Sequence, residues 1–226
     1  MDQRTLVKFL DFANHHADAS YDDIEFVCDR VAKYGFNAAF VNPFYVPSAQ
    51  KYVQEAIKKK IKIGTAISFP LGQETLGIKI ASSVEAVKNG ADEIDVSTNM
   101  GLLNFGQDGL YLEELKQIIN EVKNQRKEMV VKFIIETGLV LFEDRIKAAA
   151  EMILQSGADF VKICSGMGPR GASLKDVELV KNAVGDKIKI KVAGGIDTLK
   201  EALDFLNAGV SRIGTSKAIE IIKELR

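Results

Sequence analysis

The chain has 226 residues, of which 46% are hydrophobic and 27% are charged. This composition is typical of an ordinary globular protein and excludes an intrinsically disordered one. The 30 basic residues are matched by 31 acidic residues, so neither a basic stripe for nucleic acid nor an acidic tail for a basic partner is indicated.

The sequence also bears on cellular location and on metal binding. No stretch approaches the about 20 apolar residues that span a bilayer, and the N-terminus has no signal-peptide core. Cys28 and Cys164 have no disulfide or metal-binding spacing, so we expect a cytoplasmic protein without membrane association, with Cys28 in the core. His15 and His16 are expected in solvent, and two adjacent histidines cannot supply a catalytic metal site.

Short apolar runs alternate with amphipathic stretches along the chain. Strands are expected at 6–12, 38–42, 61–67, 93–97, 130–136, 159–164, 188–193 and 211–215. The alternation predicts parallel βαβ units, and the nearly continuous apolar character of the strands predicts burial on both faces. Eight such units favour an α/β fold, a TIM (β/α)8 barrel forming a single domain over residues 1–226, rather than an open doubly wound sheet.

A short repeat recurs where four of these strands begin. Its copies start at Gly35, Gly90, Gly157 and Gly209, and each glycine is expected to end the preceding helix. Because side chains alternate faces along a strand, the sixth residues of the copies are equivalent. These residues are Phe40, Asp95, Lys162 and Gly214. We therefore expect Asp95 to face Lys162 inside the barrel near its C-terminal end, with Gly214 leaving room for a ligand.

Three lysines, Lys132, Lys162 and Lys191, lie inside apolar strands, where a lysine must be paired or lose its charge. Neighbouring ammonium groups depress each other's pKa, and Schiff-base chemistry needs a neutral lysine. We predict that Lys162 is the nucleophile, that Lys191 keeps it neutral, and that Asp95 transfers protons while Lys132 holds it. The alternatives are lysines that reach solvent at strand ends and an Asp95 that only forms salt bridges.

Glycine-bearing loops follow the strands at 159–164, 188–193 and 211–215. In such barrels the loops after the seventh and eighth strands often bind phosphate through backbone N–H groups. The residues predicted to bind substrate or phosphate are Gly166, Gly194, Gly195, Gly214, Thr215, Ser216 and Lys217. Nearby, Ser173 to Asp176 is typical of a capping box, whereas Thr137 is equally consistent with a helix cap and with a functional residue.

Taken together, these segments resemble the deoxyribose-phosphate aldolase family, class I aldolases on a TIM barrel. The resemblance runs in order through nearly the whole chain. It is carried by LVKFLDFANHHADAS, AAFVNPFYVPSA, AISFPLG, GADEIDVSTN, VVKFIIET, GADFVKICSG, IKVAGGI and SRIGTSKA.

The resemblance implies reversible cleavage of 2-deoxy-D-ribose 5-phosphate to acetaldehyde and D-glyceraldehyde 3-phosphate. It implies Lys162 as the Schiff-base lysine, Lys191 as the lysine that tunes it, Asp95 as the proton relay and Lys132 as its support. Gly194, Gly195, Gly214 and Ser216 match the phosphate cradle, and no cofactor is needed because a protonated imine accepts the electrons. Barrels of this size often dimerise, so a homo-oligomer is compatible with the sequence.

The chain departs from the family pattern at several positions. Ile163 and Cys164 replace two hydroxyl residues after the nucleophile, and Asp197 stands where the family usually has a basic residue. A carboxylate beside a phosphate dianion is unfavourable, so we expect Asp197 to cap the following helix and Lys217 or Arg170 to supply the charge.

These departures leave alternatives open. One is an aldolase of the same family acting on a different hydroxyaldehyde or sugar phosphate. Another is a non-catalytic sugar-phosphate-binding barrel, against which the four retained residues Asp95, Lys132, Lys162 and Lys191 argue.

Overall fold

A computed structural model describes residues 1–225 and shows a closed barrel of eight parallel strands in sequential order. The strands are β1 (Leu10–Asn14), β2 (Ala38–Val41), β3 (Lys62–Ile67), β4 (Glu93–Ser97), β5 (Val130–Ile135), β6 (Phe160–Ile163), β7 (Lys189–Ala193) and β8 (Arg212–Thr215). Seven of the eight predicted strands agree with these bounds to within one residue at each end. The predicted (β/α)8 barrel is therefore confirmed.

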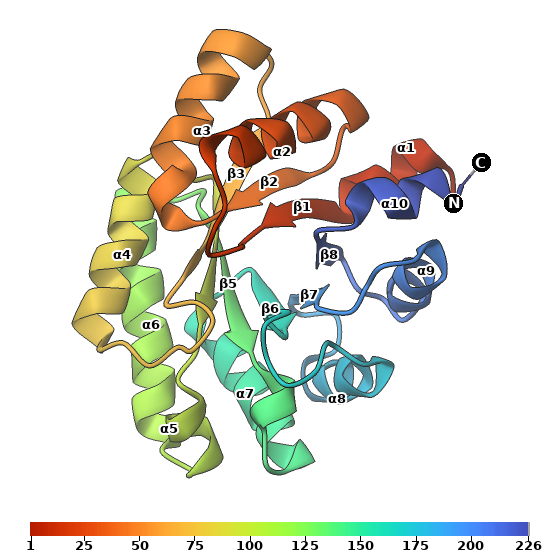
Figure 1. The fold of residues 1–226 in the computed structure, drawn as a ribbon. Coiled ribbons are helices and arrows are strands. Elements are labelled where there is room, and N and C mark those ends of the chain that lie inside the picture. Colours follow the sequence, from red (N-terminus) through yellow and green to blue (C-terminus); the bar gives the residue numbers. More distant parts are fainter. Residues whose placement is uncertain (226) are drawn as a thin grey trace.

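Helices surround the barrel and cover the outer faces of its strands (Figure 1). They are α1 (Gln3–Leu6), α2 (Tyr21–Tyr34), α3 (Val46–Tyr52), α4 (Leu76–Lys88), α5 (Met100–Asn104), α6 (Asp108–Gln125), α7 (Glu143–Ser156), α8 (Leu174–Val184), α9 (Leu199–Asn207) and α10 (Ala218–Lys223). Short 3-10 turns at 7–9, 43–45 and 137–139 and a π turn at 53–57 complete the elements. The hydrophobic core lies between the helices and the strands, and Cys28 is buried in it as predicted.

The prediction for the first strand was wrong. Asp2 caps a short helix by accepting a hydrogen bond from the N–H of Thr5, and a 3-10 turn follows at 7–9. Because a short apolar run fits a helix as well as a strand, periodicity alone could not place this boundary. The real β1 continues to Asn14, and His15 therefore follows directly at the C-terminal end of the barrel.

Left-handed glycines end the helices as the repeat predicted. Gly35 follows α2 with φ 78°, and Gly157 follows α7 with φ 84°. Residues with a Cβ rarely adopt this left-handed backbone conformation. These turns set the phase of the next strand, so the sixth residue of each repeat copy points into the barrel. Ser173 and Asp176 form the predicted capping box of α8.

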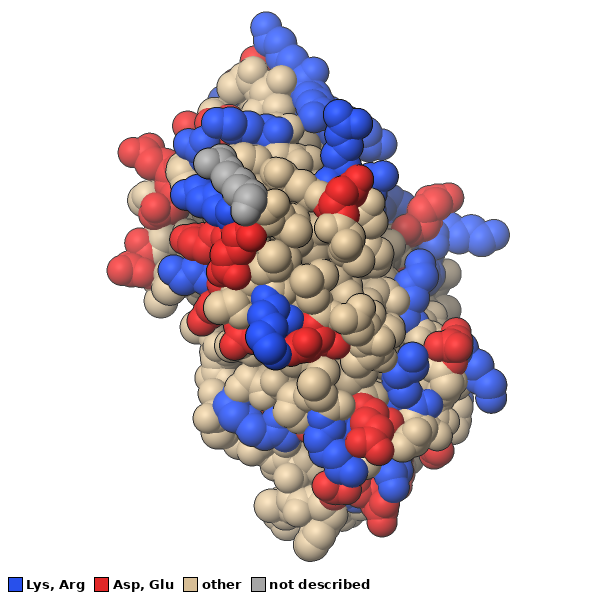
Figure 2. All heavy atoms as spheres, turned by 90° about the vertical axis from the view of Figure 1, so that its right-hand side faces the viewer, with Lys and Arg blue, Asp and Glu red and all other residues tan. Residues whose placement is uncertain are grey.

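The outer surface bears charges of both signs. On the face shown in Figure 2, Lys and Arg side chains intermingle with Asp and Glu, without a large area of one sign. None of the helices within residues 1–225 is long and apolar enough to cross a membrane.

Candidate active site

Three lysines converge on one carboxylate inside the barrel. Strand pairing sets Asp95 opposite Lys132, and Lys162 opposite Lys191. The Lys132 Nζ lies 2.9 Å from Asp95 Oδ1, whereas the Nζ atoms of Lys162 and Lys191 lie 2.9 and 2.8 Å from Oδ2. All four side chains are buried. The structure thus brings together the four residues that the sequence selected, and they make direct contacts.

A second layer of charge lies beside this cluster. Asp11 Oδ2 is 2.7 Å from Lys191 Nζ, and Asp11 Oδ1 is 3.0 Å from the Arg212 guanidinium. Glu93 Oε2 is 2.7 Å from Lys132 Nζ. Sequence reasoning missed Asp11, Glu93 and Arg212 as members of the cluster. For Glu93 and Arg212 a signal was available, because each stands two residues before a predicted inward residue and so shares its face.

The buried charges do not cancel. Asp11, Glu93 and Asp95 carry three negative charges against four positive charges on Lys132, Lys162, Lys191 and Arg212. Lys62 also reaches Glu93 at 3.2 Å, but its side chain is half exposed. Burial raises the pKa of Asp11, although Lys191 and Arg212 oppose the shift. A raised pKa favours the protonated, neutral carboxyl, and this can only add to the excess of positive charge. One buried cation is therefore in surplus.

The pKa of Lys162 is lowered within this cluster. Burial is the largest cause, the positive charge of Lys191 acts in the same direction and the attraction of Asp95 opposes both, which together leave the pKa at about 8. For Lys132, burial acts in the same direction, but Asp95 and Glu93 outweigh it and raise the pKa. Burial also opposes ionisation of Asp95, yet the three lysines together hold its pKa well below the ordinary value.

Aromatic rings exclude water from the amines. The Lys191 Nζ lies 3.6 Å from the centre of the Phe40 ring, and the Lys162 Nζ lies 5.6 Å from that of Phe69. Gly64 is required for this packing, because a Cβ there would come within 2.4 Å of the Phe40 ring. Rings at these distances also attract the cations through their negative faces.

A cavity of about 220 Å³ opens above Lys162 and Lys191 at the C-terminal end of the barrel. The predicted binding residues that line it are Gly166, Gly194, Gly195, Gly214, Thr215 and Ser216. Lys217 is not part of the lining; its side chain is half exposed, 3.9 Å from Glu220. Asp95 and Lys132 also lie outside the lining, below the two lysines that meet the cavity.

The loop after β6 closes one side of this cavity and is fixed by two acidic residues. The Ser165 N–H donates to Glu136 Oε2 at 3.0 Å, and the Ser165 hydroxyl also donates to that oxygen. Arg170 binds Asp176 through both terminal nitrogens, at 2.6 and 2.9 Å. Arg170 therefore does not supply charge to the phosphate end, contrary to one expectation.

Neither Thr137, for which a helix cap and a functional role were equally open, nor Asp197, which was expected to be a cap, caps a helix. Thr137 makes no capping hydrogen bond; its hydroxyl donates to Asp176 Oδ2 and contacts the Cys164 thiol, both at 3.0 Å. Helix α9 is capped by Thr198 in a capping box with Glu201, and not by Asp197. The Thr-x-x-Glu spacing was the available signal, since a capping box needs Glu at the third helical position.

The expectation that His15 lies in solvent was also wrong. His15 lines the cavity, with its ring centre 5.0 Å from that of Phe69 and its Nδ1 3.3 Å from Asn42 Oδ1. Burial and the charge of Lys162 lower its pKa to about 4, so the imidazole is neutral at physiological pH. The shifted position of β1 explains the difference, because the strand ends two residues later than predicted and carries His15 to the mouth of the barrel. His16 is exposed but also borders the cavity.

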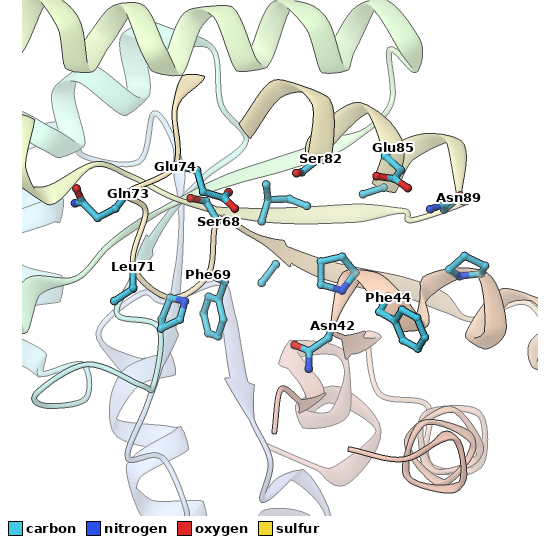
Figure 3. A pocket seen from close by; sticks show the side chains of 16 residues that line it. Asn42, Phe44, Ser68, Phe69, Leu71, Gln73, Glu74, Ser82, Glu85 and Asn89 are labelled. Atoms are coloured by element: carbon cyan, nitrogen blue, oxygen red, sulfur yellow. The ribbon is translucent and has the colours of Figure 1, made fainter. Parts of the chain in front are cut away.

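A larger groove of about 770 Å³ lies outside the barrel mouth, between α4 and the segments that follow β2 and β3 (Figure 3). Phe69 belongs to the lining of both hollows. The groove is lined by Asn42, Phe44, Glu74 and Glu85 among others, without a lysine, histidine or cysteine. The smaller cavity is the better candidate because it alone contains the perturbed amine.

Comparison with known proteins identifies relatives over the full length of the barrel. The sequence profile of the DeoC/LacD family aldolases matches residues 1–216. The deoxyribose-phosphate aldolase of Caldicellulosiruptor saccharolyticus is 38% identical over 224 residues, 99% of this chain and 100% of that protein. The deoxyribose-phosphate aldolase of Mycoplasmoides pirum is 40% identical over 215 residues, 92% of each chain. The solved structure of the aldolase QR15 superposes with a TM-score of 0.87 at 36% identity, covering 97% of this chain and 95% of that one.

Proposed function

The chain belongs to the DeoC/LacD family of aldolases, and on that premise we propose that Lys162 forms the Schiff base in its reaction. The reaction is the reversible cleavage of 2-deoxy-D-ribose 5-phosphate to acetaldehyde and D-glyceraldehyde 3-phosphate. The observation that carries the assignment is that Lys162, whose pKa is lowered to about 8, also borders the cavity. A nucleophilic lysine must be both neutral and accessible to the carbonyl carbon.

In the cleavage direction, the neutral Lys162 Nζ adds to the C1 carbonyl of the open-chain sugar. Loss of water then gives a protonated imine. A base removes the proton of the C3 hydroxyl, the C2–C3 bond breaks, and its electron pair moves toward the imine nitrogen. Glyceraldehyde 3-phosphate leaves, and the remaining enamine is protonated at C2. Water hydrolyses the resulting imine, which releases acetaldehyde and restores Lys162.

The other cluster residues serve proton transfer and charge. Asp95 Oδ2 lies within 3 Å of the Nζ atoms of both Lys162 and Lys191, so Asp95 and Lys191 can exchange protons with groups bound there. Lys132 holds Asp95 from the side away from the cavity and stays charged. We assign Lys132 as a positioning residue because it does not line the cavity.

The far end of the cavity is assigned to the phosphate. The N–H groups of Gly195, Ile196 and Ser216 have no protein acceptor within residues 1–225, so they are free to donate to phosphate oxygens. The Thr215 hydroxyl is already engaged, because it donates to the Ile196 carbonyl and accepts from the Lys217 N–H. The backbone thus provides most of the binding that the sequence assigned to these loops.

The Schiff base is tested by trapping. Incubation with acetaldehyde and borohydride should leave an N-ethyl group on Lys162, identified by peptide mass spectrometry. Because the neutral amine reacts, the trapping rate should rise with pH and reach half its maximum near pH 8. An adduct on Lys191 or on an exposed lysine, or no adduct, would contradict the assignment.

The role of Lys191 is tested by a Lys191→Met variant. Removing its positive charge relieves the repulsion that lowers the pKa of Lys162, so that pKa should rise. We expect the pH of half-maximal trapping to move about one to two units toward alkaline values. Substituting the exposed Lys189 on the same strand by Met should leave the pH profile unchanged. An acidic shift in Lys191→Met would show that Lys191 does not keep Lys162 neutral.

A further inference from the structure

The end of the cavity assigned to phosphate carries a negative charge of its own. Asp197 lines the cavity, its side chain forms no ion pair within residues 1–225, and the residue is exposed. Helix α9 begins two residues after Asp197, and Thr198 rather than Asp197 is its cap. Its carboxylate is therefore free to act on whatever occupies this end of the cavity.

No fixed side-chain cation offsets this carboxylate. The cavity lining contains no arginine, and its lysines are Lys162 and Lys191, both of which contact Asp95 at the reaction end. His15 stays neutral, and neither Lys217 nor Arg170 lines the cavity; they pair with Glu220 and Asp176. Within residues 1–225, the groups that line this end and can stabilise a dianion are therefore backbone dipoles.

Part of that backbone support is also occupied. Glu201 Oε2 accepts hydrogen bonds from the N–H groups of Asp197 and Thr198, both at 3.0 Å, and from the Thr198 hydroxyl at 2.8 Å. These N–H groups stand at the start of a nine-residue helix, where an anion would otherwise find donors and a favourable dipole. A second carboxylate has therefore taken this position.

We propose that Asp197 is a specificity-determining residue that weakens selection for phosphate, so that unphosphorylated 2-deoxy sugars are turned over alongside the phosphorylated substrate. This inference rests on the proposed function, because it concerns the ligand of the same Schiff-base site. The physical cause is repulsion between the Asp197 carboxylate and the phosphate dianion, which an uncharged hydroxymethyl end does not experience.

The experiment compares kcat/KM for 2-deoxy-D-ribose 5-phosphate and for 2-deoxy-D-ribose in the wild type and in Asp197→Asn. Assays are run at pH 8.5, above the pKa of about 8 of Lys162, so that the nucleophilic amine is mostly neutral. The ratio of the two kcat/KM values should rise about threefold to tenfold in Asp197→Asn, as expected for removal of one charge near a dianion in a solvated site. The change should lie in KM for the phosphate ester, with little effect on the unphosphorylated sugar.

Asp186→Asn is the matched control, because Asp186 is a 98% exposed carboxylate in the turn before β7, at the opposite end of the barrel. Its ratio should equal that of the wild type, which would exclude a general effect of net charge. An unchanged or lower ratio in Asp197→Asn, while borohydride trapping at Lys162 remains normal, would overturn this inference alone. Failure of the wild type to form the acetaldehyde adduct would instead overturn the proposed function together with it.

Discussion

A Lys162→Met variant is expected to lose aldolase activity by about 10⁴-fold or more, as happens when other enzymes lose their nucleophile. Methionine is close to lysine in length but has no amine, so neither the imine nor the enamine can form. Retro-aldol turnover measured at pH 8 with saturating substrate, together with borohydride trapping, checks the result.

The same substitution should not weaken the fold. Because Lys162 is the surplus cation, its removal leaves Asp11, Glu93 and Asp95 balanced by Lys132, Lys191 and Arg212. Removing an unbalanced buried charge also removes its desolvation cost, and Asp95 keeps Lys132 and Lys191 as partners, so no carboxylate is left unpaired. We therefore expect the free energy of unfolding at pH 7, from urea titration, to stay equal or to rise.

Lys189→Met is the control for this variant, since Lys189 is an exposed lysine near the other end of β7. It should keep wild-type activity and trapping. Residual turnover above about 1% of wild type in Lys162→Met would show that another amine forms the Schiff base. A large loss of stability would show that Lys162 is not the surplus charge.

The central cluster could be predicted from the sequence because it depends on local regularities. Strand periodicity fixes which side chains point inward, and left-handed glycines at Gly35 and Gly157 fix the phase of each strand. These two features were sufficient to place Asp95 opposite Lys162. They need no knowledge of packing. The observed contact of 2.9 Å goes one step further, because it joins side chains of β4 and β6, two strands that do not pair with each other.

What the sequence did not reveal depends on contacts between distant segments. Asp11 and Arg212 are 201 residues apart, yet they pair where β1 meets β8 to close the barrel. His15 was misplaced because the boundary of β1 could not be read from a short apolar run. Asp197 was misplaced because either of two adjacent residues could cap α9. Thr198 is the cap, since it forms a capping box with Glu201, and the Asp197 carboxylate is left uninvolved.

Asp95→Asn should have the largest effect on stability. The substitution keeps the shape of the side chain but removes the one carboxylate that Lys162 contacts within residues 1–225. It leaves three buried amines facing an amide. Breaking a buried ion pair by removing one partner costs about 3–5 kcal/mol. The loss in unfolding free energy at pH 6 should fall in this range, because Lys132 retains Glu93 and Lys191 retains Asp11.

The loss should also depend on pH in a defined direction. Without Asp95, the attraction that opposes deprotonation of Lys162 is gone, so its folded-state pKa should fall below about 8, further from its unfolded value. A folded-state pKa below the unfolded one means that the unfolded chain binds more protons, and stability then increases with pH. The difference from wild type should therefore be smaller at pH 9 than at pH 6.

Glu114→Gln provides the comparison for Asp95→Asn. Glu114 is a buried carboxylate 2.7 Å from the fully buried Lys79 where α4 packs against α6, away from the cavity. The Glu114→Gln variant should also be less stable than wild type, but it should keep its activity per folded molecule. Asp95→Asn should lose activity as well as stability, because it lacks the proton carrier beside Lys162. An Asp95→Asn variant as stable as wild type at pH 6 would show that the three lysines are not all charged in the folded protein. The buried cluster would then have no excess of positive charge, and the assignment of Lys162 as nucleophile would lose its support.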